Sequence, residues 1–338
     1  MKKIKKIQYF RGGKILSFVF LLGLFSCSDE PEPPAQPARD YKKAMRSFVE
    51  DLSVWAKTQQ SGFLVIPQNG VQLTTTTGTI KGGPDLTYLG AIDAVAQEDL
   101  YYGYDDFDVK SPLSFQSEIG PFLDQAHYNE KVVLVTNYCS TPHYVDDAYQ
   151  RCDGKGYVSF AASSRNLNEI PSYPDVPWHV NDAEVTSLDS VKNFLYLLDH
   201  ESFGTKQQFI NAVAATDYDL LITDAFYGEN AFTPADVEAM RVKANGGKRL
   251  VVAYMSIGEA EDYRYYWKDD WVKDPPSWLE DENPEWEGNY KVKYWEQAWQ
   301  DIIFGNDNSY LQKILDAGFD GVYLDIIDAF EFFEEQGE

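Results

Sequence analysis

The residues best suited to chemistry are carboxylates that directly follow short apolar runs. The clearest run is Val322-Tyr323-Leu324, which is followed at once by Asp325 and three residues later by Asp328. Such a run is typical of a strand buried on both faces of a parallel sheet. Parallel α/β folds place their chemistry at the carboxyl ends of their strands, which makes both aspartates candidate functional residues. A capping or turn role for an isolated aspartate is the alternative.

The same pattern recurs along the chain. The polar residues that come just after other expected strands are Asn69, Glu98, Asn137, Asp199, Asp224 and Glu259. Because all strand ends of a parallel barrel point to one face, these side chains are expected to converge at one rim. Any one of them could instead be a cap, but five acids at equivalent positions favour a shared site.

The elements that would position these acids alternate between strands and helices. The expected strands are 63–66, 89–96, 132–136, 157–161, 194–198, 220–223, 250–255 and 322–324. Helical patterns cover 41–59, 111–127, 142–150, 206–214, 310–317 and a stretch that starts at Pro234 and stops at Gly246-Gly247. Eight such strands predict an α/β fold of the (β/α)₈ barrel type, and a doubly wound open sheet is the structural alternative.

The ends of the pattern are unusual. The chain starts on a helix, 41–59, and the last strand has almost no helix after it. A barrel needs an outer helix there, so we expect helix 41–59 to cover the last strand. The segment 163–189 contains Pro171, Pro174 and Pro177 and shows no periodicity, which predicts a long connection.

Composition limits the classes of partner. The chain has 338 residues, 44% hydrophobic and 15% aromatic, and a formal net charge of −25. This charge disfavours nucleic acid and anionic membrane surfaces and favours a cationic ligand. No G-x-G-x-x-G follows a strand, no P-loop is found, and the 4 histidines show no metal-ligand spacing, so neither a cofactor nor a metal is expected.

The first 40 residues predict export and anchoring. A lysine-rich start and a short apolar core, 15–25, lead into Leu24-Phe25-Ser26-Cys27, which resembles a bacterial lipobox with Cys27 as the lipidated residue. Residues 1–27 are then a lipoprotein signal peptide, 28–40 a Pro-rich acidic linker, and 41–338 a single domain. We expect a protein anchored in the bacterial cell envelope, at the outer membrane and facing either side. A plain signal peptide with an incidental cysteine is the alternative.

Two further cysteines, Cys139 and Cys152, remain. In an oxidising envelope they could form a disulfide that closes a short loop. The sequence leaves this pairing open.

The carboxy-terminal half resembles glycoside hydrolase family 114. The residues that carry the resemblance are Ser256-Ile257-Gly258-Glu259-Ala260-Glu261-Asp262-Tyr263-Arg264, the run from Glu282 to Tyr290, Val292-Lys293-Tyr294-Trp295, and the run from Gly318 to Asp328. Known members of that family are endo-α-1,4-polygalactosaminidases on a TIM-barrel fold. The resemblance covers roughly residues 194–331.

The order of the motifs departs from the family. In the family, a helix, a strand ending in Pro-Gln-Asn-Gly and a strand ending in Glu-Asp come after the Leu-Asp-Ile-Ile-Asp motif. Here the similar segments, 41–59, Ile66 to Gly70 and Gln97-Glu98-Asp99, come before it. The sequence therefore looks like a circular permutant, with its joint near 163–189. Permutation is tolerated when the original termini lie close together at the surface.

The resemblance implies roles for named residues. It implies a retaining hydrolase in which Asp325 is the nucleophile and Glu98 the general acid/base. Substrate-binding candidates are then Asn69, Asp199, Asp224, Glu259, Asp328, Tyr101, Tyr102, Tyr254 and Trp295. The acids would pair with the ammonium groups of a polysaccharide of amino sugars, and the aromatic rings would stack on sugar faces, with core packing as their alternative role.

Two other functions stay open on the sequence alone. One is a non-catalytic carbohydrate-binding lipoprotein on the same barrel, because a fold does not fix a function. The other is a hydrolase of a different α-linked glycan. The presence of both mapped acids favours an enzyme.

Overall fold

The computed structural model describes residues 39–336. The predicted signal peptide with Cys27, nearly all of the linker 28–40, and residues 337–338 lie outside the described residues. Within the described range, no helix is both long and apolar enough to cross a membrane.

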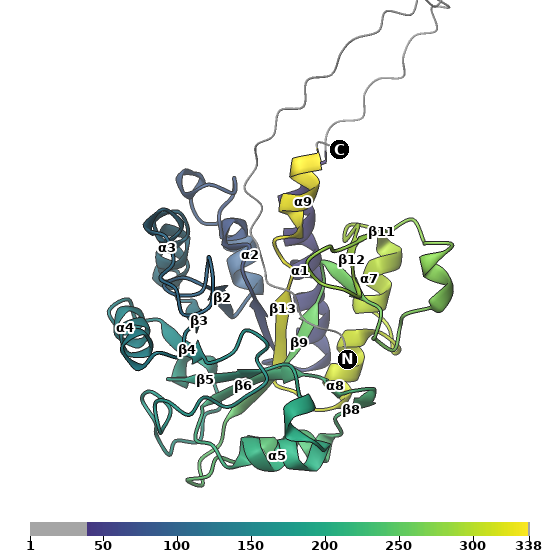
Figure 1. Ribbon diagram of the computed structural model, residues 1–338. Coiled ribbons are helices and arrows are strands. Elements are labelled where there is room, and N and C mark those ends of the chain that lie inside the picture. The colour runs from purple at the N-terminus through teal and green to yellow at the C-terminus, as the bar shows by residue number, and fades with distance from the viewer. Residues whose placement is uncertain (1–38, 337–338) are drawn as a thin grey trace, which may run out of the picture.

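Two parallel sheets form the centre of the molecule (Figure 1). Among residues 39–336, one sheet has five strands in the order β1-β13-β9-β6-β5, and the other has three in the order β2-β3-β4. Their bounds are β1 Leu64–Pro67, β2 Ala94–Glu98, β3 Val132–Tyr138, β4 Val158–Ala162, β5 Phe194–Leu197, β6 Leu220–Asp224, β9 Leu250–Ser256 and β13 Gly321–Asp325. The strands are short and almost wholly buried, as parallel strands covered on both faces must be.

The two sheets are neighbours. Gln68, directly after β1, bridges in parallel to Ala96 of β2, and the backbone N–H of Asn69 donates to the Ala96 carbonyl at 2.8 Å. At the other edge β4 contacts β5, and the ring of Phe160 lies 5.6 Å from that of Phe194. This α/β arrangement with a parallel central sheet is compatible with a TIM-barrel-like fold.

Helices lie outside the strands (Figure 1). Their bounds are α1 Tyr41–Gln59, α2 Leu86–Ala91, α3 Leu113–Tyr128, α4 Pro142–Asp153, α5 Lys206–Ala214, α6 Pro234–Arg241, α7 Gln297–Ile303, α8 Tyr310–Asp316 and α9 Ala329–Gln336. The helix α1 buries Met45, Phe48 and Leu52 at helical spacing. It contacts α8 and α9, which precede and follow β13, and Gln60 donates to the Phe319 carbonyl at 3.4 Å. The expectation that this helix covers the last strand therefore agrees with the contacts.

Two elements differ from the sequence-based expectation. The first half of the expected strand 89–96 is helix α2, because Asp85 caps it through the Tyr88 backbone N–H and the buried Tyr88, Leu89 and Ile92 recur at helical spacing. A helix, α9, also follows the last strand. It forms because Phe330 and Phe333 are buried on one face, where Phe333 stacks on Tyr41 of α1.

An aromatic excursion covers the end of β9. It contains the antiparallel strands β10 Glu259–Glu261, β11 Leu279–Glu282 and β12 Asn289–Val292, and then α7. The indole of Trp299 is fully buried and donates to the Ile257 carbonyl at 2.9 Å, which fixes the excursion on the turn after β9. A small hairpin, β7 Phe226–Tyr227 with β8 Asn230–Ala231, follows β6.

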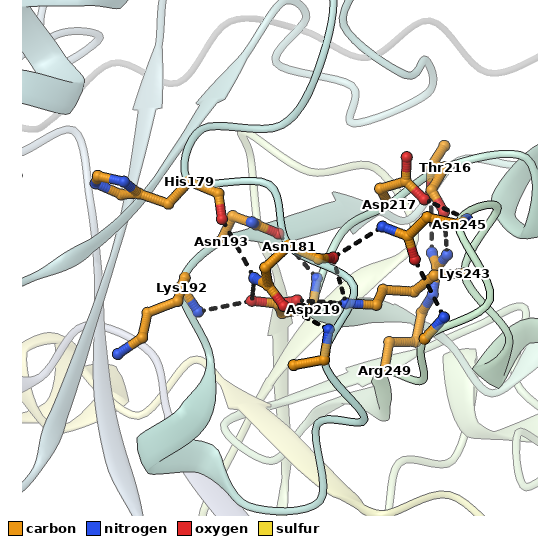
Figure 2. Close-up of polar contacts among 12 residues, drawn as sticks. His179, Asn181, Lys192, Asn193, Thr216, Asp217, Asp219, Lys243, Asn245 and Arg249 are labelled. Atoms are coloured by element: carbon orange, nitrogen blue, oxygen red, sulfur yellow. Dashed lines mark hydrogen bonds and ion pairs between the residues drawn. The ribbon is translucent and has the colours of Figure 1, made fainter.

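The long connection between β4 and β5 is held by polar contacts. Asn181 of this connection donates to Asp219 at 2.9 Å, and its carbonyl accepts from Lys243 at 2.8 Å (Figure 2). Asp219 and Lys243 form an ion pair at 3.0 Å with no exposed side-chain surface. Asp219 immediately precedes β6, so this cluster lies at the amino-terminal end of the sheet. The ion pair thus fixes an irregular segment to the parallel strands.

Replacing Lys243 by Met should lower the free energy of unfolding by about 3–5 kcal/mol, because Asp219 would stay buried without its cation. Urea unfolding of the two proteins measures the difference. The matched control is Lys248→Met, since Lys248 is exposed and should change stability by less than about 0.5 kcal/mol. Equal effects of the two substitutions would contradict the role assigned to the ion pair.

Candidate active site

Glu98 is the last residue of β2 and is surrounded by hydrogen-bond donors. Its carboxylate accepts from the Tyr138 hydroxyl, from the Gln68 amide and, at 3.4 Å, from the Asn69 amide. The side chain is partly accessible to solvent. Burial raises the pKa of Glu98, while the three donors and the charge of Arg165 oppose this rise. A raised pKa helps a carboxyl to hold the proton that a general acid must donate.

Asp325 is the last residue of β13. Its Oδ2 accepts from the Tyr254 hydroxyl at 2.7 Å, and its Oδ1 accepts from the Ile326 backbone N–H at 2.8 Å. It too is partly accessible. Burial first, and then the negative charge of Glu98, raise the pKa of Asp325 to about 8. The two carboxyls are therefore close enough to influence each other's ionisation.

Gln68 connects the strands that carry these acids. Its backbone N–H donates to the Leu324 carbonyl of β13 at 2.8 Å, and its side-chain amide donates to Glu98 of β2. Its Oε1 accepts from the hydroxyl of Tyr196, a residue of β5, at 3.0 Å. This one side chain, between the two acids, therefore fixes the orientation of the Glu98 carboxyl relative to β13.

The backbone turns sharply after each of these strands. Asn69, Asp99 and Ile326, which follow β1, β2 and β13, have φ values of 60°, 60° and 57°. This left-handed region is uncommon for any residue with a side chain and is strained for β-branched isoleucine. The neighbouring Gly70 is at φ 52°, and a Cβ there would lie 2.9 Å from Ile327 Cγ2. Three left-handed turns therefore follow adjacent strands, and the one at Ile326 is strained, as backbone at functional sites often is.

Tyrosines that the sequence analysis did not select line the inside below the acids. The rings of Tyr196 and Tyr323 are in tilted contact with centroids 5.1 Å apart, and burial raises the pKa of both well above the ordinary value. Tyr138 donates to Glu98 as described above. The available signal was position, because each lies on a strand, within two residues of its carboxyl end or at that end. Tyr138 thus provides a neutral donor to the Glu98 carboxylate, and Tyr196 donates to the amide oxygen of Gln68.

Several predicted binding residues do gather around the two acids. Tyr254 donates to Asp325, and Asn69 contacts Glu98 and accepts from the Glu98 backbone N–H at 3.1 Å. Asp328 is half-buried, and burial raises its pKa to about 6, with the charges of Glu259 and Glu98 adding to the rise and Lys291 opposing it. These three residues lie close to Asp325 and Glu98 at the carboxyl ends of the strands.

Three other predicted acids have structural partners. Asp224 pairs with Arg264 at 2.8 Å, and that guanidinium also binds Glu261. Glu259 is fully buried and accepts from Lys291 at 2.7 Å and from Asn283 at 2.8 Å. Asp199 caps the turn after β5 by accepting the Glu201 backbone N–H at 3.0 Å. Their position at the rim is as expected, but their charges are largely engaged in holding the loops.

Three predicted aromatic residues pack elsewhere. Tyr101 lies under the Arg151 guanidinium of α4 at 4.3 Å, and Tyr102 donates to Asp147 of the same helix. Trp295 packs against Tyr41 of α1 and Phe333 of α9, with ring centroids 5.2 and 4.7 Å away. Core packing, the alternative in the sequence analysis, accounts for these rings, so they do not belong to the candidate site.

Asn137 and the cysteines are also structural. The Asn137 Oδ1 accepts the backbone N–H groups of Tyr101 and Tyr102 at 2.9 and 3.2 Å. Cys139 and Cys152 are both buried free thiols, so the disulfide considered above is not formed; burial raises the pKa of each to about 12. Within residues 39–336, no three His, Cys, Asp or Glu side chains are arranged as a metal site.

The geometry can support displacement at a carbon between two carboxyls. Glu98 and Asp325 lie on β2 and β13, the two strands that flank β1, and come from distant parts of the chain. One carboxyl can attack or stabilise positive charge while the other donates a proton to a leaving oxygen. A parallel α/β fold with such a pair at its strand ends is of the class that cleaves glycosidic bonds.

Comparison with known proteins supports this class. Residues 181–337 match the model of glycoside-hydrolase family GH114, so the resemblance to that family is confirmed over this part of the chain. The family implies glycosidase chemistry and a carbohydrate substrate. The match includes Asp325 but not Glu98, whose assignment therefore depends on the geometry.

Three similar proteins are named only as uncharacterized. One from Methanocaldococcus jannaschii is 47% identical over 158 residues, which cover 46% of this chain and 43% of that protein. One from Thermotoga maritima is 47% identical over 100 residues, 30% of this chain and 29% of that protein. One from Deinococcus radiodurans is 40% identical over 128 residues, 38% of this chain and 39% of that protein. Each match thus spans less than half of the relative.

Replacing Asp325 by Asn should make the protein more stable, and the gain should grow with pH. Because the folded-state pKa lies above the unfolded value of about 3.9, the carboxyl favours folding only while it is protonated, and this contribution is lost as pH rises from about 4 to about 8. An amide never ionises. We expect a gain on the order of 1–3 kcal/mol near pH 9 and almost none near pH 4.

Thermal unfolding across this pH range measures the effect. The control is Asp51→Asn, at an exposed position of α1, which should change stability little at any pH. A gain that is larger in acid than in base would contradict the assigned cause.

Proposed function

We propose that the chain is a retaining glycoside hydrolase with Asp325 as the nucleophile and Glu98 as the general acid/base. Asp325 attacks the anomeric carbon while Glu98 protonates the leaving glycosidic oxygen, which gives a covalent glycosyl-enzyme. Glu98 then takes a proton from water, and that water displaces Asp325. A retaining mechanism needs the two carboxyls about 5–5.5 Å apart.

The observation that carries the proposal is the electrostatic coupling of two accessible carboxyls from opposite ends of the chain. Nothing local in the sequence brings Glu98 near Asp325, yet the charge of Glu98 acts on Asp325 and Gln68 lies between them. Both carboxyls accept hydrogen bonds from tyrosines, and among residues 39–336 neither forms an ion pair. A purely structural acid in such surroundings would be expected to carry a salt bridge.

The proposed substrate is a polysaccharide of α-linked amino sugars, such as partly deacetylated α-1,4-galactosaminogalactan. The family resemblance supports the linkage and the sugar. The net charge of −25 and the half-buried Asp328 beside the acids support a cationic polymer. A substrate ammonium group beside these carboxyls would favour their ionised forms, so it would help Asp325 to lose its proton on binding.

We further propose that the eight parallel strands close into a (β/α)₈ barrel that is circularly permuted relative to the family. The bridge between Gln68 and Ala96 and the contact between β4 and β5 support closure. The packing of α1 on α8 and α9 supports permutation, because a helix from the start of the chain then serves the last strand. The joint would lie in the irregular segment 163–189.

Purified protein should depolymerise partly deacetylated galactosaminogalactan, and Asp325→Asn and Glu98→Gln should each lower kcat by about 10³-fold or more. With an aryl α-galactosaminide and azide, Asp325→Asn should give a glycosyl azide of inverted configuration, because azide replaces the nucleophile. Glu98→Gln should give the retained azide, because the covalent intermediate still forms. Product analysis by NMR distinguishes the two.

The control is Asp124→Asn, a carboxylate on α3 that binds Lys155 and Tyr157 away from the site. It should leave kcat unchanged. Binding of the polymer without cleavage by the wild type would favour a carbohydrate-binding protein, and cleavage of another α-glycan would change the substrate but not the mechanism.

We also propose that the protein is a cell-envelope lipoprotein anchored through Cys27, on the basis of residues 1–40. In a bacterial host that lipidates such signals, Cys27→Ser should move the protein from the membrane fraction to the soluble fraction. Labelling with a palmitate analogue should be lost at the same time. Unchanged membrane association with no label in the wild type would contradict the anchor.

A further inference from the structure

Arg165 lies beside the candidate acid/base but outside the sequence motifs. It belongs to the irregular segment after β4. Its guanidinium sits over the ring of Tyr138, 4.5 Å from the centroid, and pairs with Asp99 at 3.1 Å. Tyr138 donates to Glu98, and Asp99 is the next residue in the chain after Glu98. Arg165 therefore contacts Tyr138, one of the donors to the Glu98 carboxyl, and Asp99 in the turn that follows Glu98.

Glycine at position 103 makes this arrangement possible. Gly103 has φ +120°, and its carbonyl accepts from the Arg165 guanidinium. A Cβ there would lie 2.1 Å from Asp99 Oδ1, 3.0 Å from Tyr138 Cβ and 3.2 Å from Arg165 Nη2. The three side chains thus converge on a space that only glycine leaves open. This close fit indicates a specific arrangement of the cluster and not a chance contact.

We propose that Arg165 is a positioning residue for Glu98: it fixes Tyr138 and the Asp99 turn and supplies the positive charge that faces the Glu98 carboxyl. The proposal rests on the proposed hydrolase function for its role in catalysis. It goes beyond that function because it assigns a role to a residue outside the acidic motifs. Arg165 also lies outside residues 181–337, the segment that the family model matches.

Arg165 is the cation among the groups that act on Glu98. The other titratable groups that face Glu98 from their own elements are Asp99, Tyr138 of β3, Tyr196 of β5, Tyr323 and Asp325 of β13, and Asp328. Burial is the cause that raises the pKa of Glu98, and the Arg165 charge lowers the pKa of both Glu98 and Asp99. Burial raises the pKa of Asp99 to about 7, and the Arg165 charge opposes this rise, so Arg165 favours the ionised form of Asp99 beside Glu98.

Removing this cation should move the basic limb of the pH–activity profile. In Arg165→Gln and Arg165→Met the Glu98 proton should be held more tightly, so the basic limb of kcat/KM should move up by on the order of one pH unit. We expect kcat to fall about tenfold. Arg165→Lys keeps the charge and should restore most of the limb position, although it lacks the planar stack on Tyr138.

The chain offers a matched control. The Arg151 guanidinium lies over the Tyr101 ring, 4.3 Å from its centroid, much as that of Arg165 lies 4.5 Å from the Tyr138 centroid. Arg151→Gln and Arg151→Met should therefore remove a guanidinium from a tyrosine ring but leave the pH profile unchanged. A basic limb that does not move in either Arg165 variant, or that moves equally in the Arg151 variants, would overturn the proposal while leaving the hydrolase function in place.

A second measurement does not need activity. The free energy of unfolding is compared between wild type and Glu98→Gln across pH, and then between Arg165→Gln and the double variant. Because burial raises the folded-state pKa of Glu98, wild type loses stability relative to Glu98→Gln as pH rises through that pKa. Without Arg165 this loss should occur at higher pH and be larger. An unchanged titration would overturn the proposal even if no hydrolysis were found.

Discussion

The parallel pairing of β1 with β13 is the interaction on which the candidate site depends. It aligns residues 64–67 with 321–324, the two ends of the described domain, and it leaves Gln68 beside Asp325. The bridge from Gln68 to Ala96 then sets β2, and so Glu98, on the other side of β1. Each acid is local to its own strand, but their proximity exists only because these three strands are adjacent. The candidate site therefore exists only where this long-range pairing has formed.

That pairing forces carboxyls into a partly dry space, which is costly, and the surroundings limit the cost in different ways. Tyr138, Tyr254 and Gln68 donate hydrogen bonds without adding charge. Asp224 and Glu259, at the same rim, are instead neutralised by Arg264 and Lys291. The contrast separates the two classes of acid better than position does. The carboxyls that have raised pKa values and stay partly exposed are those available for chemistry. The left-handed turns beside them are consistent with a site at which stability is reduced in favour of function.

The sequence was informative where the physics is local. Short apolar runs predicted the central strands, and five of the eight expected strands are followed by an acid. The helix α2 was missed because its capping residue, Asp85, competes with an apolar pattern that also suits a strand. Gln68, Tyr138 and Arg165 were missed for another reason. Their importance comes from partners 30 to 128 positions away for Gln68, 40 for Tyr138 and 66 for Arg165, and spacing along one element cannot reveal such partners.

The segment between β4 and β5 shows how an irregular connection can replace a helix. It must lead from the carboxyl end of β4 back to the amino end of β5, so it passes both ends of the parallel strands. At its start Arg165 binds Asp99 and Gly103 beside the acids, and further along Asn181 binds Asp219 and Lys243 at the opposite end. These side-chain contacts add to backbone hydrogen bonds such as that from the Val185 N–H to the Lys248 carbonyl. In parallel α/β barrels the carboxyl-end face carries function and the amino-end face carries stability. This one segment therefore contacts both ends of the strands. Its start carries Arg165, the proposed positioning residue, and its later part is anchored through Asn181 to Asp219 and Lys243.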